Sequence, residues 1–332
     1  MAIFYPEMKS APCIKKYPGN PILTDKDIAY DAALIFNAGV VKYQGKYVMI
    51  FRNDYGTSEK EFLNQDFKGT NLGIAFSDDG INWKPESKPF LALEDIKSDE
   101  ISRFYDPRLT VIDGELYICF AIDTTHGVCG GVGKITDLKK IEVLSTSLPD
   151  NRNMVLFPEK IGGLYTRFSR PFAMYGKRKF DFWSSQSPDL KFWGNHKLDL
   201  DTASVPFANE KIGPAAPPIK TEKGWLTTFH AVDTVDDRGK NGWENYWPKR
   251  YTAGLMLLDL DDPTKIVGMY NEPLIAPEFP YETDEGFRQN VIFPGGMILE
   301  DSGEVKIYYG ASDTVECLAT ADVNDLIKLC LD

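Results

Sequence analysis

The sequence lacks a stripe of lysine and arginine residues. Its 49 acidic side chains outnumber the 37 basic ones, which gives a formal net charge of −12. Because contact with a nucleic-acid backbone requires a positively charged surface, we expect no nucleic-acid partner. An anionic ligand would need a local basic pocket of its own.

Long apolar runs are also absent. No stretch approaches the roughly 18 apolar residues that a membrane helix needs. Residues 1–10 lack the apolar region of a signal peptide. We therefore expect a soluble, cytoplasmic protein with no membrane partner.

Cysteine and histidine are scarce. The five cysteines show no CxxC spacing and are odd in number, which favours a reducing compartment over a disulfide framework. The three histidines, His126, His196 and His230, are scattered and lack the spacing of metal ligands. We predict neither a metal site nor a cofactor.

Aromatic residues, glycine and proline are plentiful, which favours many short strands joined by tight turns. A pattern of two alternating strands around a glycine turn recurs over residues 40–52, 109–123, 155–170, 216–230 and 296–310. One such unit cannot bury its own faces, whereas five units closed into a ring can. The sequence therefore predicts an all-β, five-bladed β-propeller. We expect a single domain over residues 1–332, with short N-terminal and C-terminal closing segments.

Polar residues recur at equivalent places in these units, where a propeller has its central funnel. They precede each first strand, at residues 36–39, 105–108, 151–154, 210–213 and 289–291. They also stand at or near the end of each second strand, as Arg52, Asp123, Arg170, His230 and Asp313. One such group would be an ordinary surface charge, and Asp123 fits that interpretation best. Five polar groups at equivalent positions of the five units indicate a binding or catalytic site.

The motif Tyr105-Asp106-Pro107-Arg108 supplies the most informative carboxylate. Phe104 and Tyr105 would lower the local polarity, and desolvation raises a carboxyl pKa towards the range in which the group can deliver a proton. The alternative is that Asp106 is a turn residue paired with Arg108.

The mixture of groups bears on the reaction. Carboxylates, amides and aromatic rings suit a sugar, and Asp106 with Asp313 or Asp123 could form the carboxylate pair of a glycosidase. Several cations facing one funnel repel each other unless an anion lies among them. That basic set favours phosphate as the nucleophile in place of water.

Several motifs together resemble the β-mannoside phosphorylases of glycoside hydrolase family 130, in order and over nearly the whole chain. They are Phe36-Asn37, Phe51-Arg52, residues 105–108, residues 151–160, Ser169-Arg170-Pro171, Lys211-Ile212-Gly213, residues 290–294 and residues 307–314. Within this family, the chain resembles the phosphorylases that act on β-1,4-mannooligosaccharides, mannosyl-glucose or mannosyl-N-acetylglucosamine. The resemblance implies a five-bladed propeller and an inverting phosphorolysis. In that reaction a β-mannoside and inorganic phosphate give α-mannose 1-phosphate and a shortened acceptor sugar.

The resemblance also implies roles for individual residues. Asp106 matches the single catalytic acid, which passes its proton through a substrate hydroxyl. The phosphate-binding set comprises Arg152, Asn153, Arg170, Lys211 and His230. In the substrate-binding set, Asn37, Arg52 and Asp313 match positions that line the mannose subsite. Tyr251 and Phe293 match aromatic residues near the acceptor, and Tyr105 and Arg108 complete the set.

Two segments depart from the family pattern, residues 172–180 and 236–250, and we expect both to border the acceptor side. The acceptor sugar therefore has three candidates: mannose, glucose and N-acetylglucosamine. We favour a β-1,4 linkage over a β-1,2 linkage. Trp243 and Trp247 could stack on an acceptor ring or form a subunit contact in a homo-oligomer. The alternatives to a phosphorylase are a hydrolase on the same fold and a non-catalytic carbohydrate-binding propeller.

Overall fold

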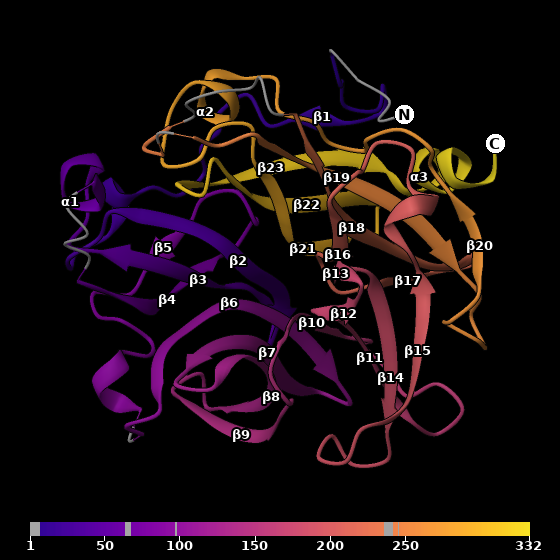
Figure 1. The fold of residues 1–332 in the computed structure, drawn as a ribbon, viewed down its shortest axis with the longest axis horizontal. Helices are drawn as coiled ribbons and strands as arrows, with labels where there is room; N and C mark the ends of the chain where they lie inside the picture. The colour runs from indigo at the N-terminus through magenta and orange to yellow at the C-terminus, as the bar shows by residue number, and fades with distance from the viewer. Residues whose placement is uncertain (1–6, 64–67, 97, 236–241, 245) are drawn as a thin grey trace.

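The computed structural model describes residues 7–63, 68–96, 98–235, 242–244 and 246–332. Five antiparallel sheets of four or five strands surround a common centre as the blades of a propeller (Figure 1). The first strands of blades 1 to 4 contact one another in order at this centre, and the first strand of blade 5 contacts that of blade 1 and later strands of blade 4. The five-bladed β-propeller predicted from the repeats is therefore confirmed.

The first three blades follow chain order from the centre outwards. Blade 1 contains β2 (Leu34–Tyr43), β3 (Lys46–Tyr55), β4 (Gly69–Ser77) and β5 (Lys84–Pro85). Blade 2 contains β6 (Ile101–Ile112), β7 (Glu115–Thr124), β8 (Gly127–Thr136) and β9 (Lys140–Thr146). Blade 3 contains β10 (Asn151–Leu156), β11 (Tyr165–Pro171), β14 (Phe182–Ser187) and β15 (Gly194–Leu200).

Blades 4 and 5 carry the additions to this pattern. Blade 4 contains β16 (Lys211–Pro214), β18 (Gly224–Thr234), β19 (Lys249–Leu258) and β20 (Ile266–Met269), with β17 (Ile219–Thr221) also paired to β18. Blade 5 contains β21 (Ile292–Leu299), β22 (Glu304–Ala311), β23 (Val315–Asp322) and β1 (Lys15–Lys16). A separate hairpin comprises β12 (Ala173–Tyr175) and β13 (Lys177–Lys179).

Helices are few and short. The α-helices are α1 (Glu59–Leu63), α2 (Pro280–Thr283) and α3 (Val323–Leu331). Single 3₁₀ turns cover Asp25–Asp27, Leu93–Asp95 and Thr202–Ser204. Among the described residues, no helix has the length and apolarity to cross a membrane.

The N-terminal segment closes the ring onto the last blade. Strand β1 pairs with β23, so that Lys15 lies opposite Thr320 and Lys16 opposite Ala319. The ammonium of Lys16 donates to the buried Glu282 carboxylate at 2.7 Å. This contact fixes the N-terminal segment to the connection between blades 4 and 5, while the pairing of β1 with β23 closes the ring.

The apolar core lies between blades. Ile50 of blade 1 belongs to the same buried cluster as Ile118 of blade 2. Val132 of blade 2 and Leu156 of blade 3 share another. Each blade therefore buries its faces against its neighbours, and burial of one such aliphatic side chain stabilises the fold by about 1.5–3 kcal/mol.

Tight turns connect the first two strands of blades 1 and 2. Gln44 and Gly45 have φ values of 51° and 78°, and Asp113 and Gly114 have 52° and 77°. Positive φ at both loop residues is the geometry of a two-residue hairpin whose twist matches that of its strands. These turns confirm the hairpins predicted at both positions.

Candidate functional site

Three inner strands contain a β-bulge at an Asn or Asp residue. The register shifts in β2, β6 and β10 around Asn37, Asp106 and Asn153, whose φ values are 54°, 53° and 56°. Asn and Asp tolerate this left-handed conformation better than most residues, and a bulge re-aims the side chain. These residues therefore lie within the strands and not before them as the sequence predicted, because a bulge breaks the alternation by which strand starts were recognised.

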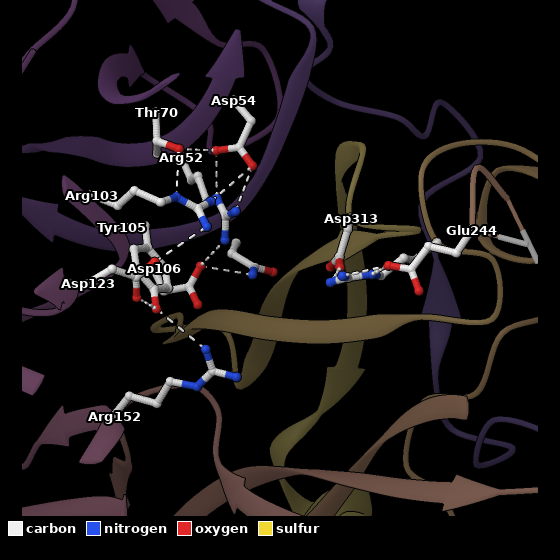
Figure 2. A network of polar contacts seen from close by, with 12 residues as sticks. Arg52, Asp54, Thr70, Arg103, Tyr105, Asp106, Asp123, Arg152, Glu244 and Asp313 are labelled. Atoms are coloured by element: carbon white, nitrogen blue, oxygen red, sulfur yellow. Dashed lines mark hydrogen bonds and ion pairs between the residues drawn. The ribbon is translucent and has the colours of Figure 1, made fainter. Parts of the chain in front are cut away.

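The carboxylate of Asp106 accepts two hydrogen bonds from blade 1 (Figure 2). Asn37 Nδ2 donates to Asp106 Oδ1 at 3.0 Å, and Arg52 Nη1 donates to the same oxygen at 3.3 Å. Arg52 is itself fixed by Asp54, to which Nε and Nη2 donate at 2.9 and 2.6 Å. Asp106 thus occupies a strand and not a turn, and its position is set by the neighbouring blade.

The electrostatic surroundings of Asp106 differ from the sequence-based expectation. Burial raises the pKa of Asp106, but the positive charges of Arg52 and Arg108 and the Asn37 hydrogen bond outweigh it. The net pKa is lowered from its usual value. The expectation that desolvation by the flanking aromatic rings would leave the Asp106 pKa raised is therefore wrong.

Arg108 lies at the base of the site and is 3% exposed. Its Nε donates to the Ala215 carbonyl at 2.7 Å, and its Nη1 donates to the carbonyls of Asn37 and Pro107 at 3.0 and 2.7 Å. These contacts connect blades 1, 2 and 4. They favour a role in holding the centre of the ring over the direct sugar contact predicted for Arg108.

Tyr105 bridges two charged groups. Its hydroxyl donates to Asp123 Oδ1 at 2.7 Å and accepts a hydrogen bond from Arg152 Nη1 at 3.4 Å. Asp123 also forms an ion pair with Arg103 at 3.5 Å. Asp123, for which an ordinary surface charge was the best sequence interpretation, therefore belongs to the network around Asp106.

A basic cluster lies beside Asp106 and comprises Arg152, Arg170 and Lys211. Arg152 and Arg170 are directly opposite each other in β10 and β11. Arg170 Nη1 donates to His230 Nε2 at 2.8 Å, while His230 Nδ1 lies 3.1 Å from the Pro214 carbonyl. Since a carbonyl can only accept, His230 carries its proton on Nδ1 and orients Arg170 with Nε2. Gly213 permits this packing, because a Cβ there would lie 2.6 Å from the His230 ring.

The cluster is electrostatically strained. Burial, and then the charge of Arg152, lower the pKa of Arg170 to about 9. Burial and Arg170 lower the pKa of Lys211 well below its usual value, and they do the same to His230. The carboxylate of Glu210 lies 3.9 Å from Lys211 but is closer to Lys249, at 2.9 Å. An anion bound among these cations would stabilise their charged forms.

The segment 172–180 covers this cluster. Phe172 and Phe180 flank the hairpin of β12 and β13, with ring centroids 5.2 Å apart. The Arg170 guanidinium lies over both rings, at 5.4 and 5.3 Å. Arg152 lies over Phe172, and Lys211 over Phe180. We expected this segment on the acceptor side, but its contacts are with the basic cluster.

Asp313 and Glu244 lie together, apart from the group around Asp106 (Figure 2), and Arg288 joins them. Arg288 Nη1 donates to Asp313 Oδ2 at 3.3 Å, and Arg288 Nε and Nη2 donate to Glu244 Oε1 at 2.9 and 2.7 Å. Burial raises the pKa of Asp313 despite the neighbouring Arg288 and Arg52. The structure therefore brings a second carboxylate to the site, with a pKa shifted in the direction opposite to that of Asp106.

The aromatic residues named from the sequence lie at different depths. Tyr251 stacks on the buried Trp247 at 6.1 Å, and Phe293 stacks on His230 at 4.7 Å. Trp247 is therefore internal packing and not an exposed contact surface. Trp243 packs against Phe62 and Phe287 at 6.3 and 5.3 Å and borders a cavity. Residues 236–241 and 245 of the divergent segment lie outside the described residues.

Sequence reasoning missed Asp54, Arg103, Glu244 and Arg288. Asp54 could have been found, because it lies two residues after Arg52 and so points to the same face of its strand. Arg288 and Glu244 lie outside regular strands, where no periodic pattern marks them.

One protein family matches this chain over almost its whole length. Residues 11–332 match the family model of glycoside hydrolase family 130, described as β-1,4-mannooligosaccharide phosphorylase. This protein belongs to glycoside hydrolase family 130.

Named relatives of this family 130 protein cleave two linkages. A β-1,4-mannooligosaccharide phosphorylase of Ruminococcus albus is 33% identical, over 96% of this chain and 92% of the relative. A 1,2-β-oligomannan phosphorylase of Thermoanaerobacter sp. is 30% identical, over 94% of this chain and 98% of the relative. The family 130 protein is thus an enzyme of the glycoside phosphorylase type.

A solved structure supports the fold of this family 130 member. The β-1,2-mannobiose phosphorylase of Listeria innocua, in complex with β-1,2-mannobiose, superposes with a TM-score of 0.81. The superposition covers 96% of this chain and 99% of that protein, at 24% identity. At this identity the similarity concerns the propeller and not the substrate.

Proposed function

We propose that this protein catalyses the inverting phosphorolysis of a β-mannoside, with β-1,4-linked substrates favoured. Inorganic phosphate would be the co-substrate, and α-mannose 1-phosphate and a shortened acceptor sugar would be the products. The observation that carries the proposal is the basic cluster of Arg152, Arg170 and Lys211 beside the Asp106 carboxylate. The family description and the R. albus relative support the β-1,4 linkage.

In this mechanism the basic cluster holds phosphate on one face of the anomeric carbon. A phosphate oxygen forms the new bond to that carbon as the bond to the acceptor oxygen breaks on the opposite face. Asp106 supplies the proton that the acceptor oxygen gains, by way of a substrate hydroxyl. No water is consumed, and no second catalytic carboxylate is required.

Phosphate also supplies a reason for Asp106 to become protonated. Besides Arg52 and Arg108, the charge of Arg152 lowers the pKa of Asp106. A phosphate dianion beside Arg152 would offset this positive charge and so raise the pKa of Asp106. Binding of phosphate and protonation of the acid are therefore coupled.

The test is the phosphate dependence of product formation. The enzyme is incubated with β-1,4-mannobiose or β-1,2-mannobiose, with and without inorganic phosphate, and α-mannose 1-phosphate and free mannose are quantified. We expect α-mannose 1-phosphate only with phosphate, and a faster reaction with the β-1,4 substrate. Turnover at the same rate without phosphate would identify a hydrolase. If the enzyme cleaved β-1,2-mannobiose but not β-1,4-mannobiose, the proposed β-1,4 specificity would be wrong.

The charge of Lys211 predicts a pH dependence. Because the pKa of Lys211 is lowered well below its usual value, the ammonium is lost as pH rises through that lowered pKa. Phosphate binding then weakens, so the KM for phosphate should rise on the alkaline side. Arginine keeps its charge to higher pH.

The comparison that tests this is Lys211→Arg against the wild type, in phosphate KM measured across pH. The rise in KM should begin at higher pH in the variant. The ionisation of phosphate itself changes the KM of both proteins in the same way, so it cancels when the two pH profiles are compared. Superimposable profiles would contradict the role of the Lys211 charge.

A further inference from the structure

The two arginines of the basic cluster are held in place by different partners. Arg170 Nη1 lies 2.8 Å from His230 Nε2, which orients that guanidinium. Arg152 Nη1 donates to the Tyr105 hydroxyl at 3.4 Å, and among the described residues this is the only side-chain hydrogen bond of Arg152. Arg152 Nε is buried and has no partner among the same residues. The direction of the Arg152 guanidinium therefore depends on the lone pairs of the Tyr105 hydroxyl.

Asp123 decides which way those lone pairs point. The Tyr105 hydroxyl donates its single proton to Asp123 Oδ1 at 2.7 Å, because a carboxylate oxygen can only accept. Burial raises the pKa of Tyr105 to about 12, so the hydroxyl keeps this proton at neutral pH. With the proton held by Asp123, the hydroxyl oxygen presents its lone pairs to Arg152 (Figure 2).

The pairing of β6 with β7 places Asp123 beside Tyr105. Arg103 and Tyr105 are two residues apart in β6 and so point to the same face, and Asp123 of β7 lies opposite Arg103. Asp123 is therefore a diagonal neighbour of Tyr105, within reach of its long side chain. The Arg103 guanidinium pairs with Asp123 at 3.5 Å and lies over the Tyr105 ring at 5.0 Å. These contacts fix the carboxylate relative to the phenol.

The Asp123 carboxylate reaches the basic cluster only through Tyr105. Its side-chain partners among the described residues are Tyr105 and Arg103. Arg103 has further contacts with Thr70 at 3.2 Å and with Asp54 at 3.4 Å, so it does not depend on Asp123 for its position. An effect of Asp123 on the phosphate side of the site must therefore pass through the Tyr105 hydroxyl.

We propose that Asp123 is a positioning residue, which acts through the Tyr105 hydroxyl to aim Arg152 at phosphate. The inference rests on the proposed function, in which Arg152 belongs to the phosphate-binding cluster. Without the carboxylate, the hydroxyl can turn its proton towards Arg152, and two donors then face each other. Arg152 loses the acceptor that orients it, and phosphate binding weakens.

The first experiment measures initial rates of phosphorolysis of β-1,4-mannobiose by the wild type and by Asp123→Ala. The KM for phosphate should rise by about tenfold, the loss expected when a hydrogen bond to a charged group is disrupted. The KM for mannobiose should stay within about twofold, because Arg103 keeps its contacts with Thr70 and Asp54. This difference between the two KM values distinguishes a positioning role from a general loss of structure.

Two further variants serve as comparisons. Asp123→Asn keeps an acceptor oxygen and should give a phosphate KM between those of the wild type and Asp123→Ala. Asp301→Ala removes an exposed carboxylate from the turn between β21 and β22 and should leave both KM values unchanged. Melting temperatures verify that every variant folds. An unchanged phosphate KM in folded Asp123→Ala, or equal increases in the two KM values, would overturn the proposal.

A double-mutant cycle tests the route through Tyr105. Tyr105→Phe removes the hydroxyl and should raise the KM for phosphate at least as much as Asp123→Ala does. In the double variant, the Asp123 substitution should add no further increase, because its route to Arg152 is already absent. If the two increases multiplied in the double variant, Asp123 would act independently of Tyr105 and the proposal would be wrong.

A binding measurement separates this inference from the proposed function. Calorimetric titration with inorganic phosphate requires no turnover, and Asp123→Ala should bind phosphate about tenfold more weakly than the wild type. Equal affinities would overturn the role of Asp123 even in an active phosphorylase. Weaker binding by the variant of an enzyme that releases only free mannose would support the role of Asp123 and reject phosphorolysis. A wild type that binds no phosphate would overturn both.

Discussion

Asp106→Asn is expected to lower kcat for mannoside phosphorolysis by about 10²–10⁴-fold, the range over which positioned general acids act. Asparagine has nearly the same shape and can keep the hydrogen bond from Arg52. The decrease in kcat therefore measures the loss of the proton donor, because the geometry of the site is retained. The KM for phosphate should change far less, because Asp106 faces Arg52 and Asn37 and is not part of the basic cluster.

Two controls make this prediction specific. Asp261→Asn changes an exposed carboxylate between β19 and β20 and should retain full activity. Asp313→Asn should act mainly on the KM for the sugar. Because burial raises the pKa of Asp313, a larger loss of kcat in that variant than in Asp106→Asn would transfer the acid role to Asp313.

The same variant reports on the coupling between phosphate and Asp106. Calorimetric titration of phosphate in buffers of different ionisation enthalpy should detect proton uptake by the wild type. Uptake should be smaller in Asp106→Asn, and the difference between the two proteins reports the protonation of Asp106. Identical uptake in both proteins would show that phosphate does not alter the Asp106 pKa.

Arg170→Ala is the second large effect and should lower kcat/KM for phosphate by about 10²–10³-fold, as expected when one preorganised donor to a developing anion is lost. Arg170 is 2% exposed, and its guanidinium is oriented by His230 at 2.8 Å. Lysine at this position keeps the positive charge but cannot make the bidentate contact of a guanidinium with phosphate. Arg170→Lys should therefore be more active than Arg170→Ala but less active than the wild type.

The measurement is initial rate against phosphate concentration, with thermal denaturation to confirm folding. Lys191→Ala removes an exposed cation from the β14–β15 turn and serves as the control for net charge. Full activity of a folded Arg170→Ala protein would favour the hydrolase on the same propeller, because water as nucleophile does not require this guanidinium.

Local chemistry explains which features of the fold and the site are evident in the sequence. The loops Gln44-Gly45 and Asp113-Gly114 are sequence signals for two-residue hairpins, and five such units predict five blades. Asp106, Arg152, Arg170 and His230 were recognised because they recur at equivalent positions of the repeat. The strand starts were wrong because the bulge at Asp106 interrupts a period-two pattern.

Contacts between blades account for what the sequence missed. The pKa of Asp106 depends on Arg52, which belongs to a different blade. Arg108 is close to Asp106 in the motif, yet it donates to carbonyls of blades 1 and 4. Phe172 and Phe180 come from a divergent segment, and only the folded chain places them over Arg170.

The sequence by itself determined the propeller, the number of blades and the types of residue that meet at its centre, because turns and strand periodicity are local properties of the chain. The tertiary structure decided the direction of each pKa shift, the role of Arg108 and the cavity beside Trp243. Those properties depend on distances between residues of different blades, and ring closure sets these distances.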